Sequence, residues 1–171
     1  MKLHSKVILL IVALGISACT NPGRFGPGAG GAGANGGIDS ASLGGVNDPA
    51  SPAYFQQTIG DRVLFTVDQH TLTAEAQVVL EQQAAWLLTN VDYSAVVEGH
   101  ADEQGTSAYN LALSARRANS VIEFLVDRGV SPARLRALPL GKERPIAICS
   151  EESCYAQNRR AVTVLAAGAT S

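Results

Sequence analysis

The stretch SAVVEGHADEQGTSAYNLALSARRANSVIEFLVDRG, residues 94–129, decides the fold, because a strand, an acidic loop and a long helix follow one another within it. Residues 94–98 are rich in valine and end at a glycine, a pattern that predicts a strand. From about Ser107 to Val126 apolar residues recur every three or four positions, and Gly129 follows. This spacing predicts a helix with one buried face and a glycine stop.

Further strands and a second long helix are predicted on both sides of this unit. The helix runs from about Thr71 to Thr89, with Thr73 as its N-terminal cap. Short strands are predicted at residues 63–65, 134–140 and 161–165, with a turn of helix at Ser131–Pro132. Such alternation implies an α/β fold, an α+β sandwich in which helices pack on one face of a single sheet.

An acidic loop containing Asp102 stands directly before the helix that carries Arg116 and Arg117. Neighbouring helical residues point about 100° apart, so only one of the two arginines faces this loop. A fixed anion beside a fixed cation can form an ordinary surface ion pair, worth about 0 to 1 kcal/mol. The pair can instead receive a zwitterion, whose ammonium meets Asp102 while its carboxylate meets the arginine. The residues alone favour the ion pair.

The first 18 residues have the order of a secretory signal peptide: two lysines, an apolar run from Val7 to Ile16, and small residues before Cys19. The run is about ten residues long, whereas a membrane span needs about 20. Residues 16–19, Ile-Ser-Ala-Cys, resemble the lipobox of bacterial lipoproteins, which implies that Cys19 becomes the first residue and carries lipid. Residue 20 is a threonine and not an aspartate, which by analogy with bacterial lipoproteins implies that the protein is anchored in the outer membrane and not the inner membrane. The alternative is an ordinary signal peptide with an incidental cysteine.

A glycine-rich segment, residues 19–53, is predicted to join this anchor to a folded domain of residues 54–171. It contains GPGAGGAGANGG at residues 26–37 and has little apolar surface to bury, so we expect a flexible tether. Its root-mean-square reach would be roughly 30 Å, and its fully extended length about 110 Å. The tether would therefore separate the lipid from the domain.

The charge balance excludes one class of partner. The full chain has a net charge of −2, and without Lys2 and Lys6 it keeps 11 basic against 15 acidic residues, a net charge of −4. Nucleic-acid-binding domains carry a basic stripe that neutralises phosphates. An acidic chain of this kind is not expected to bind nucleic acid.

Three motifs together resemble the OmpA-like domain family, and within it the peptidoglycan-associated lipoproteins. They are VEGHADEQGTSAYNLALSARRANSVIEFL at residues 97–125, GKERP at residues 141–145 and NRRAVTVL at residues 158–165. The resemblance covers residues 63–165 and implies the family's fold, a mixed sheet in the order βαβαββ. The family pattern has an aspartate directly after the phenylalanine of the first strand, where this chain has Thr66, with Asp68 two positions on. This departure leaves open what the first loop contributes to ligand contacts.

Carried over by motif, the resemblance implies that Asp102 and Arg117 bind the free end of diaminopimelate in the peptidoglycan stem peptide. Arg117 is the match because it directly precedes Ala118. Asn110 is implied to order the loop through its amide. The other implied supporting residues are Gly105, Asp68, Asn158 and Arg159, with Asn158 and either Arg159 or Arg160 bracing the sheet edge and the pocket rim. We expect Asp102→Ala or Arg117→Ala to weaken wall binding and to leave the fold intact.

The function implied by the resemblance is that of an outer-membrane lipoprotein with its domain in the periplasm. It would bind peptidoglycan without covalent chemistry and tether the outer membrane to the wall as part of a Tol–Pal system, supporting envelope integrity and outer-membrane invagination in cell division. Periplasmic Tol proteins are the implied partners, and no cofactor is implied beyond the lipid on Cys19.

Two alternative functions stay open from the sequence. One is an OmpA-like lipoprotein that acts mainly through periplasmic protein partners. The other is an enzyme that modifies the wall, for which His100 beside Asp102 and Glu103 is the only concentration of titratable groups. No serine, cysteine or zinc motif accompanies that histidine, so we expect no reaction.

Two cysteines remain near the C-terminal end of the chain. Cys149 and Cys154 enclose a short segment, and exported proteins meet oxidising conditions, so we expect a disulfide between them. A metal site would need two further ligands, but His70 and His100 are distant in sequence. No metal is expected.

Overall fold

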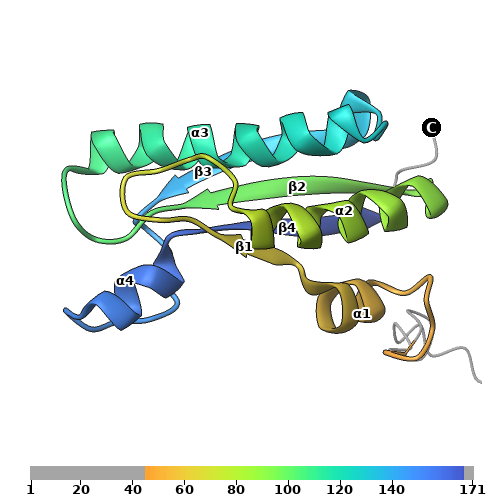
Figure 1. The fold of residues 1–171 in the computed structure, drawn as a ribbon, viewed down its shortest axis with the longest axis horizontal. Helices are drawn as coiled ribbons and strands as arrows, with labels where there is room; N and C mark the ends of the chain where they lie inside the picture. Colours follow the sequence, from red (N-terminus) through yellow and green to blue (C-terminus); the bar gives the residue numbers. More distant parts are fainter. Residues whose placement is uncertain (1–44, 168–171) are drawn as a thin grey trace, which may run out of the picture. The chain divides into compact units, whose positions relative to one another are not determined.

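The computed structural model describes residues 45–167 (Figure 1). The predicted signal peptide, Cys19 with its lipid, and most of the predicted tether lie outside these residues. Within the described range, no helix is both long enough and apolar enough to cross a membrane.

The predicted strands and long helices are all present. The strands are β1 (Arg62–Leu64), β2 (Tyr93–His100), β3 (Leu135–Gly141) and β4 (Arg160–Ala167). The helical segments are α1 (Pro52–Tyr54), the π-helical turn η2 (Phe55–Gly60), α2 (Ala74–Thr89), α3 (Ser107–Asp127), the 3-10 turn η3 (Pro132–Arg134) and α4 (Glu152–Asn158).

The four strands form one mixed sheet in the order β1-β4-β2-β3. The strand β4 lies antiparallel to both β1 and β2, while β2 and β3 are parallel. A parallel pair needs a crossover connection, and α3 supplies it. The sheet confirms the predicted fold class.

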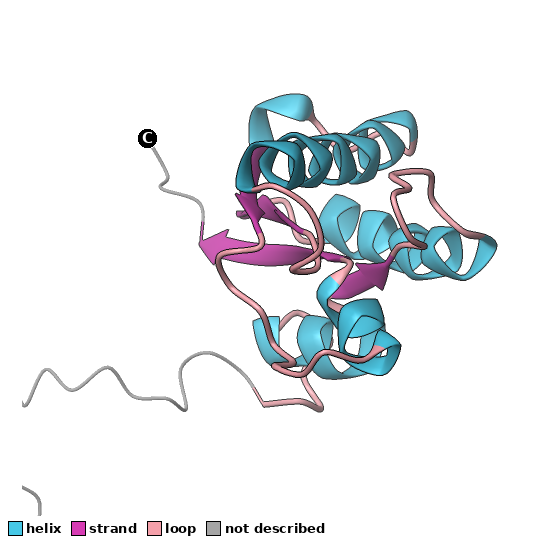
Figure 2. Cartoon of the chain, turned by 90° about the vertical axis from the view of Figure 1, so that its left-hand side faces the viewer, coloured by secondary structure: helices cyan, strands magenta, loops and turns pink. Residues whose placement is uncertain are grey.

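The core lies between the sheet and the two long helices. Viewed from the end, α2 and α3 lie on the same side of the sheet (Figure 2). The strands present alternate residues to these helices, as Ala95 and Val97 of β2 do, and both are almost fully buried. The helices contribute Leu80, Leu87, Val121 and Leu125 to the same cluster, and Phe55 joins it from η2.

Two local features fix how the elements begin and approach one another. The hydroxyl of Thr73 accepts a hydrogen bond from the backbone N–H of Ala76 over 3.2 Å, which confirms the predicted cap of α2. Gly99 of β2 faces α3 so closely that a Cβ atom there would lie 1.9 Å from the carbonyl oxygen of Ser114. The glycine therefore sets the distance between β2 and α3.

The buried face of α3 differs from the prediction in its first half. Leu111 belongs to the apolar residues whose spacing predicts the buried face of this helix, but it is 50 % exposed. Asn110, Ser114 and Arg117 are buried in that half instead, together with Leu113. Apolar spacing could not identify this face, because the polar side chains there are satisfied by hydrogen bonds to backbone groups.

The packed domain begins earlier than the predicted boundary at Tyr54. The indole N–H of Trp86 donates a hydrogen bond to the carbonyl oxygen of Pro49 over 2.7 Å. Ser51 is 2 % exposed, and its hydroxyl caps α1 by accepting from the N–H of Tyr54 over 3.0 Å. The last residues assigned to the tether therefore belong to the folded domain.

The predicted order βαβαββ lacks the α1–η2 segment before β1 and the helix α4 between β3 and β4. The sequence of α4, ESCYAQN, has no apolar stripe that would reveal a helix. Polar contacts hold it instead: Asn158 is fully buried, and Glu152 pairs with Arg159 across the length of the helix.

Candidate functional site

The predicted site lies where three connecting segments meet at one end of the sheet. In Figure 1 the loop between β2 and α3, the loop between β1 and α2, and the segment around α4 gather at the left-hand end. Gly105 gives the β2–α3 loop a left-handed turn, with φ +89°. Thr106 then caps α3, its hydroxyl accepting from the N–H of Tyr109 over 3.2 Å. The loop is thus fixed where it joins α3.

Asn110 holds the β2–α3 loop from inside the fold. Its side-chain N–H₂ donates to the carbonyl oxygens of Asp102, over 3.2 Å, and Gln104, over 2.8 Å. Its side chain is 1 % exposed, so these two bonds satisfy an amide that has no access to water. The two bonds hold the Asp102 loop against the first turn of α3.

Asp102 is 8 % exposed and accepts two hydrogen bonds through its side chain. Its Oδ1 atom accepts from the backbone N–H of Gln104 over 3.2 Å, and its Oδ2 atom accepts from Nη1 of Arg159 over 3.2 Å. A carboxylate has about four acceptor positions on its two oxygens. Asp102 therefore keeps capacity for a further donor.

Arg117 is fully buried, whereas its neighbour Arg116 is exposed. Its Nε donates to the carbonyl oxygen of Gln69 over 2.8 Å, Nη1 to that of His100 over 2.8 Å, and Nη2 to that of Thr66 over 3.3 Å. An arginine has five N–H groups, so two are left. Arg117 thus joins α3 to the β1–α2 loop and to the end of β2.

The charge of Arg117 is uncompensated by direct contact. Among residues 45–167 no carboxylate lies within ion-pair distance of its guanidinium. Burial lowers the pKa of Arg117 to about 10, although the nearby charge of Asp102 acts to raise it. The guanidinium also lies 5.2 Å from the ring centroid of Phe65. A buried cation without a paired anion favours the binding of an anionic group.

Arg159, and not Arg160, faces Asp102. Its three nitrogens meet three different partners: Nε donates to the carbonyl oxygen of Phe65 over 3.3 Å, Nη1 to Asp102, and Nη2 to Oε1 of Glu152. Burial acts to lower the pKa of Arg159, but the hydrogen bonds to Glu152 and Asp102 outweigh burial and raise it. Arg159 is therefore a fixed, charged part of the site wall.

Arg160 and Asn158 form hydrogen bonds with the segment between β3 and α4. Nη2 of Arg160 donates to the carbonyl oxygen of Arg144 over 3.1 Å. The side chain of Asn158 accepts from the N–H groups of Ile146 and Ala147 and donates to the carbonyl oxygen of Ala147. Both residues therefore hold this segment through hydrogen bonds to its backbone, and neither bonds to the Asp102 carboxylate.

Asp68 lies on the opposite rim, in the β1–α2 loop. It has a φ of +56°, a left-handed conformation that is uncommon for a residue other than glycine. Its Oδ1 atom accepts from the hydroxyl of Tyr109 over 3.4 Å. The two exposed side chains thus connect the β1–α2 loop with the start of α3.

His100, the histidine of the predicted titratable group, is buried. It is 2 % exposed, and neither ring nitrogen has a hydrogen-bond partner among the described residues. The Oε2 atom of Glu98 lies 3.5 Å from its Nε2 atom. Burial, and then the charges of Arg160 and Arg144, lower the pKa of His100 to about 4. At neutral pH the ring is uncharged.

The structure joins Cys149 and Cys154 in a disulfide, with a Cα–Cα distance of 5.8 Å. Glu152, the first residue of α4, lies inside the loop that this bond closes. The sequence placed the disulfide near the last strand but gave no connection to the Asp102 site. The disulfide loop is connected to the Asp102 site through the contacts of Glu152 with Arg159 and of Arg159 with Asp102. The only sequence feature that pointed to this connection was the pair of arginines in the NRRA motif.

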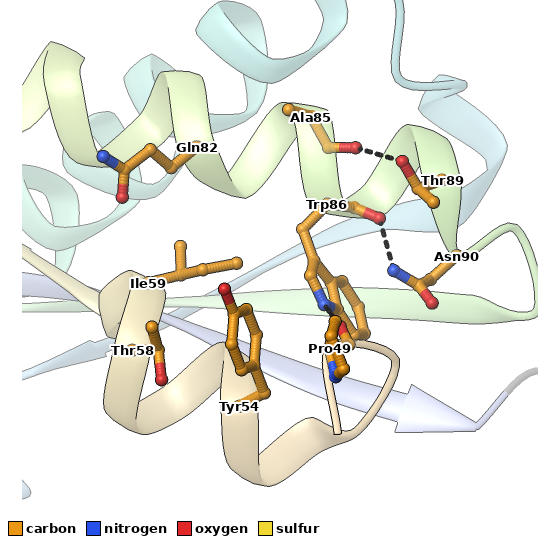
Figure 3. Close-up of a pocket in the computed structure, with 9 residues that line it drawn as sticks. All are labelled: Pro49, Tyr54, Thr58, Ile59, Gln82, Ala85, Trp86, Thr89 and Asn90. Carbon is orange, nitrogen blue, oxygen red and sulfur yellow. Dashed lines mark hydrogen bonds between the residues drawn. The ribbon is translucent and has the colours of Figure 1, made fainter. Parts of the chain in front are cut away.

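A separate pocket of about 520 Å³ lies between the α1–η2 segment and α2 (Figure 3). Tyr54, Ile59 and Trp86 supply much of its apolar lining. None of the residues predicted for the site lines this pocket. It is therefore distinct from the Asp102 site.

Comparison with known proteins places this geometry in context. A model of the OmpA family matches residues 64–159. A peptidoglycan-associated lipoprotein of Agrobacterium fabrum is 44% identical over 159 residues, which cover 93% of this chain and 86% of the relative. Another, of Mesorhizobium japonicum, is 51% identical over 121 residues, which cover 71% of this chain and 72% of the relative. The crystal structure of the peptidoglycan-associated lipoprotein from Burkholderia pseudomallei is 38% identical, with a TM-score of 0.63, and covers 71% of this chain and 98% of that chain.

Proposed function

The chain belongs to the OmpA family and, within it, to the peptidoglycan-associated lipoproteins, and from this premise we propose that it binds peptidoglycan non-covalently through Asp102 and Arg117. One observation carries the proposal. The fully buried guanidinium of Arg117 has two N–H groups without a partner and no paired carboxylate among the described residues. The charge of Asp102 is nevertheless close enough to oppose the lowering of the pKa of Arg117 by burial. A site of this kind is complementary to a ligand that carries both charges.

The free end of diaminopimelate in the stem peptide is such a ligand. It carries an ammonium and a carboxylate on one carbon atom. The carboxylate would accept from the remaining N–H groups of Arg117, and the ammonium would donate to the remaining acceptor positions of Asp102. Binding would thereby pair a cation that burial leaves without a partner.

The other residues of the site would support this pair without touching the ligand. Asn110 and Gly105 keep the Asp102 loop in shape, and Arg159 orients the Asp102 carboxylate. Asp68 would act from the β1–α2 loop through its charge, which acts to raise the pKa of Arg117. Asn158 would act further away, through the segment that precedes α4.

The protein would work as a tether between two layers of the envelope. Lipid on Cys19 would hold the N-terminal end in the outer membrane, a flexible segment would span the gap, and the domain would grip the wall. We propose that it does so within a Tol–Pal system, where it would preserve envelope integrity and draw the outer membrane inward during division.

A second function, binding of periplasmic proteins such as Tol proteins, is favoured by the segment before α4. Ile146 is 51 % exposed and Ile148 is 88 % exposed, although Asn158 and the disulfide hold this segment in place. Rigidly presented apolar side chains are typical of protein interfaces. This surface and the wall site would serve the same protein.

We propose no wall-modifying reaction. A catalytic histidine is hydrogen-bonded to the nucleophile that it activates. Neither ring nitrogen of His100 has a hydrogen-bond partner among the described residues, and burial together with the charges of Arg160 and Arg144 lowers its pKa to about 4.

Co-sedimentation with purified sacculi tests the proposed function. The fragment Gly45–Ser171 contains every residue of the packed core. We expect it to pellet with sacculi, to be released by free meso-diaminopimelate, and to release no soluble muropeptides. Pimelate, which lacks both ammonium groups, should release far less protein. A fragment that stays in the supernatant would contradict wall binding, and the release of muropeptides would show an enzyme.

A further inference from the structure

Glu152 lies at the start of α4 and reaches the wall of the Asp102 site through one intermediate side chain. Its Oε1 atom accepts from Nη2 of Arg159, whose Nη1 donates to Asp102. The side chain of Glu152 is 65% exposed, whereas those of Arg159 and Asp102 are 5% and 11% exposed. One carboxylate at the surface is thus coupled to another that lines the site.

Arg159 donates to two carboxylates, and this arrangement determines how many acceptor positions of Asp102 remain available to a ligand. Arginine and a carboxylate form their strongest pair when two parallel N–H groups meet both oxygens. Arg159 instead gives Asp102 a single contact, because its other Nη atom is held by Glu152 and its Nε atom by Phe65. The oxygens of Asp102 therefore keep acceptor positions that a bidentate pair would occupy.

We propose that Glu152 is a positioning residue for ligand binding: by holding Nη2 of Arg159, it prevents a bidentate Arg159–Asp102 pair and leaves Asp102 free to accept the ammonium of the ligand. This inference rests on the proposed function of the Asp102 site. It adds Glu152, a residue of α4, to a site whose other residues come mainly from the β1–α2 and β2–α3 loops and from α3.

The disulfide has a place in the same arrangement. Glu152 lies between Cys149 and Cys154, so the bond restricts the segment from which its side chain projects. Reduction of the bond should release Glu152 and produce the same defect as removal of its charge.

The test uses two tripeptides with the fragment Gly45–Ser171. Both have the sequence L-Ala-γ-D-Glu-meso-diaminopimelate; one has the distal amine free, and in the other that amine is acetylated and uncharged. The variants are Glu152→Gln and, as a matched control, Glu151→Gln, which removes a neighbouring exposed charge that has no ion pair among the described residues. Dissociation constants are measured by NMR titration.

We expect Glu152→Gln to bind the free-amine tripeptide about two- to fivefold more weakly, the range for one partly exposed ion pair. Its affinity for the acetylated tripeptide should equal that of the wild type, and Glu151→Gln should change neither affinity. Equal loss of both tripeptides would indicate general damage to the site and would overturn the inference, as would no loss of either. If the wild type itself does not bind the free-amine tripeptide, the proposed function fails, and this inference falls with it.

Two further measurements report on the mechanism. The Nε–H resonance of Arg159 should shift in Glu152→Gln without any ligand and stay in place in Glu151→Gln; an unmoved resonance would contradict the repositioning of Arg159. Reduction of the disulfide should weaken free-amine tripeptide binding in the wild type and leave that of Glu152→Gln unchanged. An equal loss in both proteins would show that the disulfide acts by another route.

Discussion

Nη1 of Arg159 donates to Oδ2 of Asp102 over 3.2 Å, although 57 residues separate the two in the sequence. Arg159 immediately precedes the last strand, and Asp102 is the second residue after β2. The pair therefore forms only when β4 has taken its place beside β2. The candidate binding site depends in this way on completion of the sheet.

Replacement of Gly99 by alanine should destabilise the domain strongly. A Cβ atom at this position would lie 1.9 Å from the carbonyl oxygen of Ser114, and backbone cannot yield as a side chain can. We expect the free energy of unfolding to fall by about 3 kcal/mol. Urea denaturation of the fragment Gly45–Ser171 measures it. As a control, Gly45→Ala, where nothing lies within 4 Å, should change stability by less than about 0.5 kcal/mol.

Arg117 should matter for stability as well as for binding, which corrects the expectation that Arg117→Ala leaves the fold intact. Alanine would leave three carbonyl oxygens without their donor and would remove a large buried side chain. We expect a loss of about 3 kcal/mol in the free energy of unfolding. The exposed neighbour provides the control, since Arg116→Ala should lie within about 0.5 kcal/mol of the wild type. Similar unfolding midpoints for the two variants would contradict the structural role of Arg117.

A fragment that starts at Tyr54 should be less stable than one that starts at Gly45. The shorter fragment lacks Pro49, whose carbonyl oxygen accepts from the indole of Trp86, and it exposes part of that ring. The expected difference in the free energy of unfolding is about 1 to 3 kcal/mol. Trp86→Phe, which removes the indole donor, should destabilise the longer fragment more than the shorter one. Equal stability of the two fragments would place residues 45–53 outside the cooperative unit.

The stability of the domain should fall between about pH 6.5 and pH 4 because of His100. Its pKa is about 4 in the folded protein against an ordinary 6.5, so the unfolded chain binds a proton in this range before the folded protein does. Stability contributed by the neutral ring is present above pH 6.5 and is lost as the pH falls; the full loss is about 3 kcal/mol. The groups that face the ring are Glu98, Arg144 and Arg160.

Comparison of variants isolates this contribution from that of the carboxylates. His100→Gln should lose less stability than the wild type between pH 7 and pH 4, whereas His70→Gln, at an exposed position, should follow the wild type. Parallel pH profiles for the wild type and His100→Gln would show that His100 does not titrate in this way.

The fold could be predicted from the sequence where local signals and burial agree. The valine-rich strand predicted at residues 94–98 is part of β2, which continues through Gly99 to His100, and the helix stop at Gly129 appears where the sequence placed it. The segments that escaped prediction lack such agreement. Helix α4 is held by Asn158 and by the Glu152–Arg159 pair, and neither leaves a periodic pattern.

The sequence predicted only part of the site, because some of its contacts join residues that are far apart in the chain. Motif resemblance selected Asp102 and Arg117, but local spacing could not show which arginine meets Asp102 directly. That contact belongs to Arg159 and depends on the position of β4, a long-range feature of the sheet. Likewise, composition assigns residues 45–53 to the tether, and only their contact with Trp86 assigns them to the domain.

The central claim is that Asp102 recognises a charged group of the wall, and Asp102→Asn tests it most directly. This change keeps the size of the side chain and removes its charge; Glu103→Gln, at the exposed next position, is the matched control. After denaturation has shown that both variants are folded, their binding to purified sacculi is compared with that of the wild-type fragment Gly45–Ser171. We predict that Asp102→Asn binds more weakly by roughly 2 to 5 kcal/mol, at least a tenfold loss of affinity, while Glu103→Gln binds as the wild type does. Equal sedimentation of all three proteins would contradict the claim.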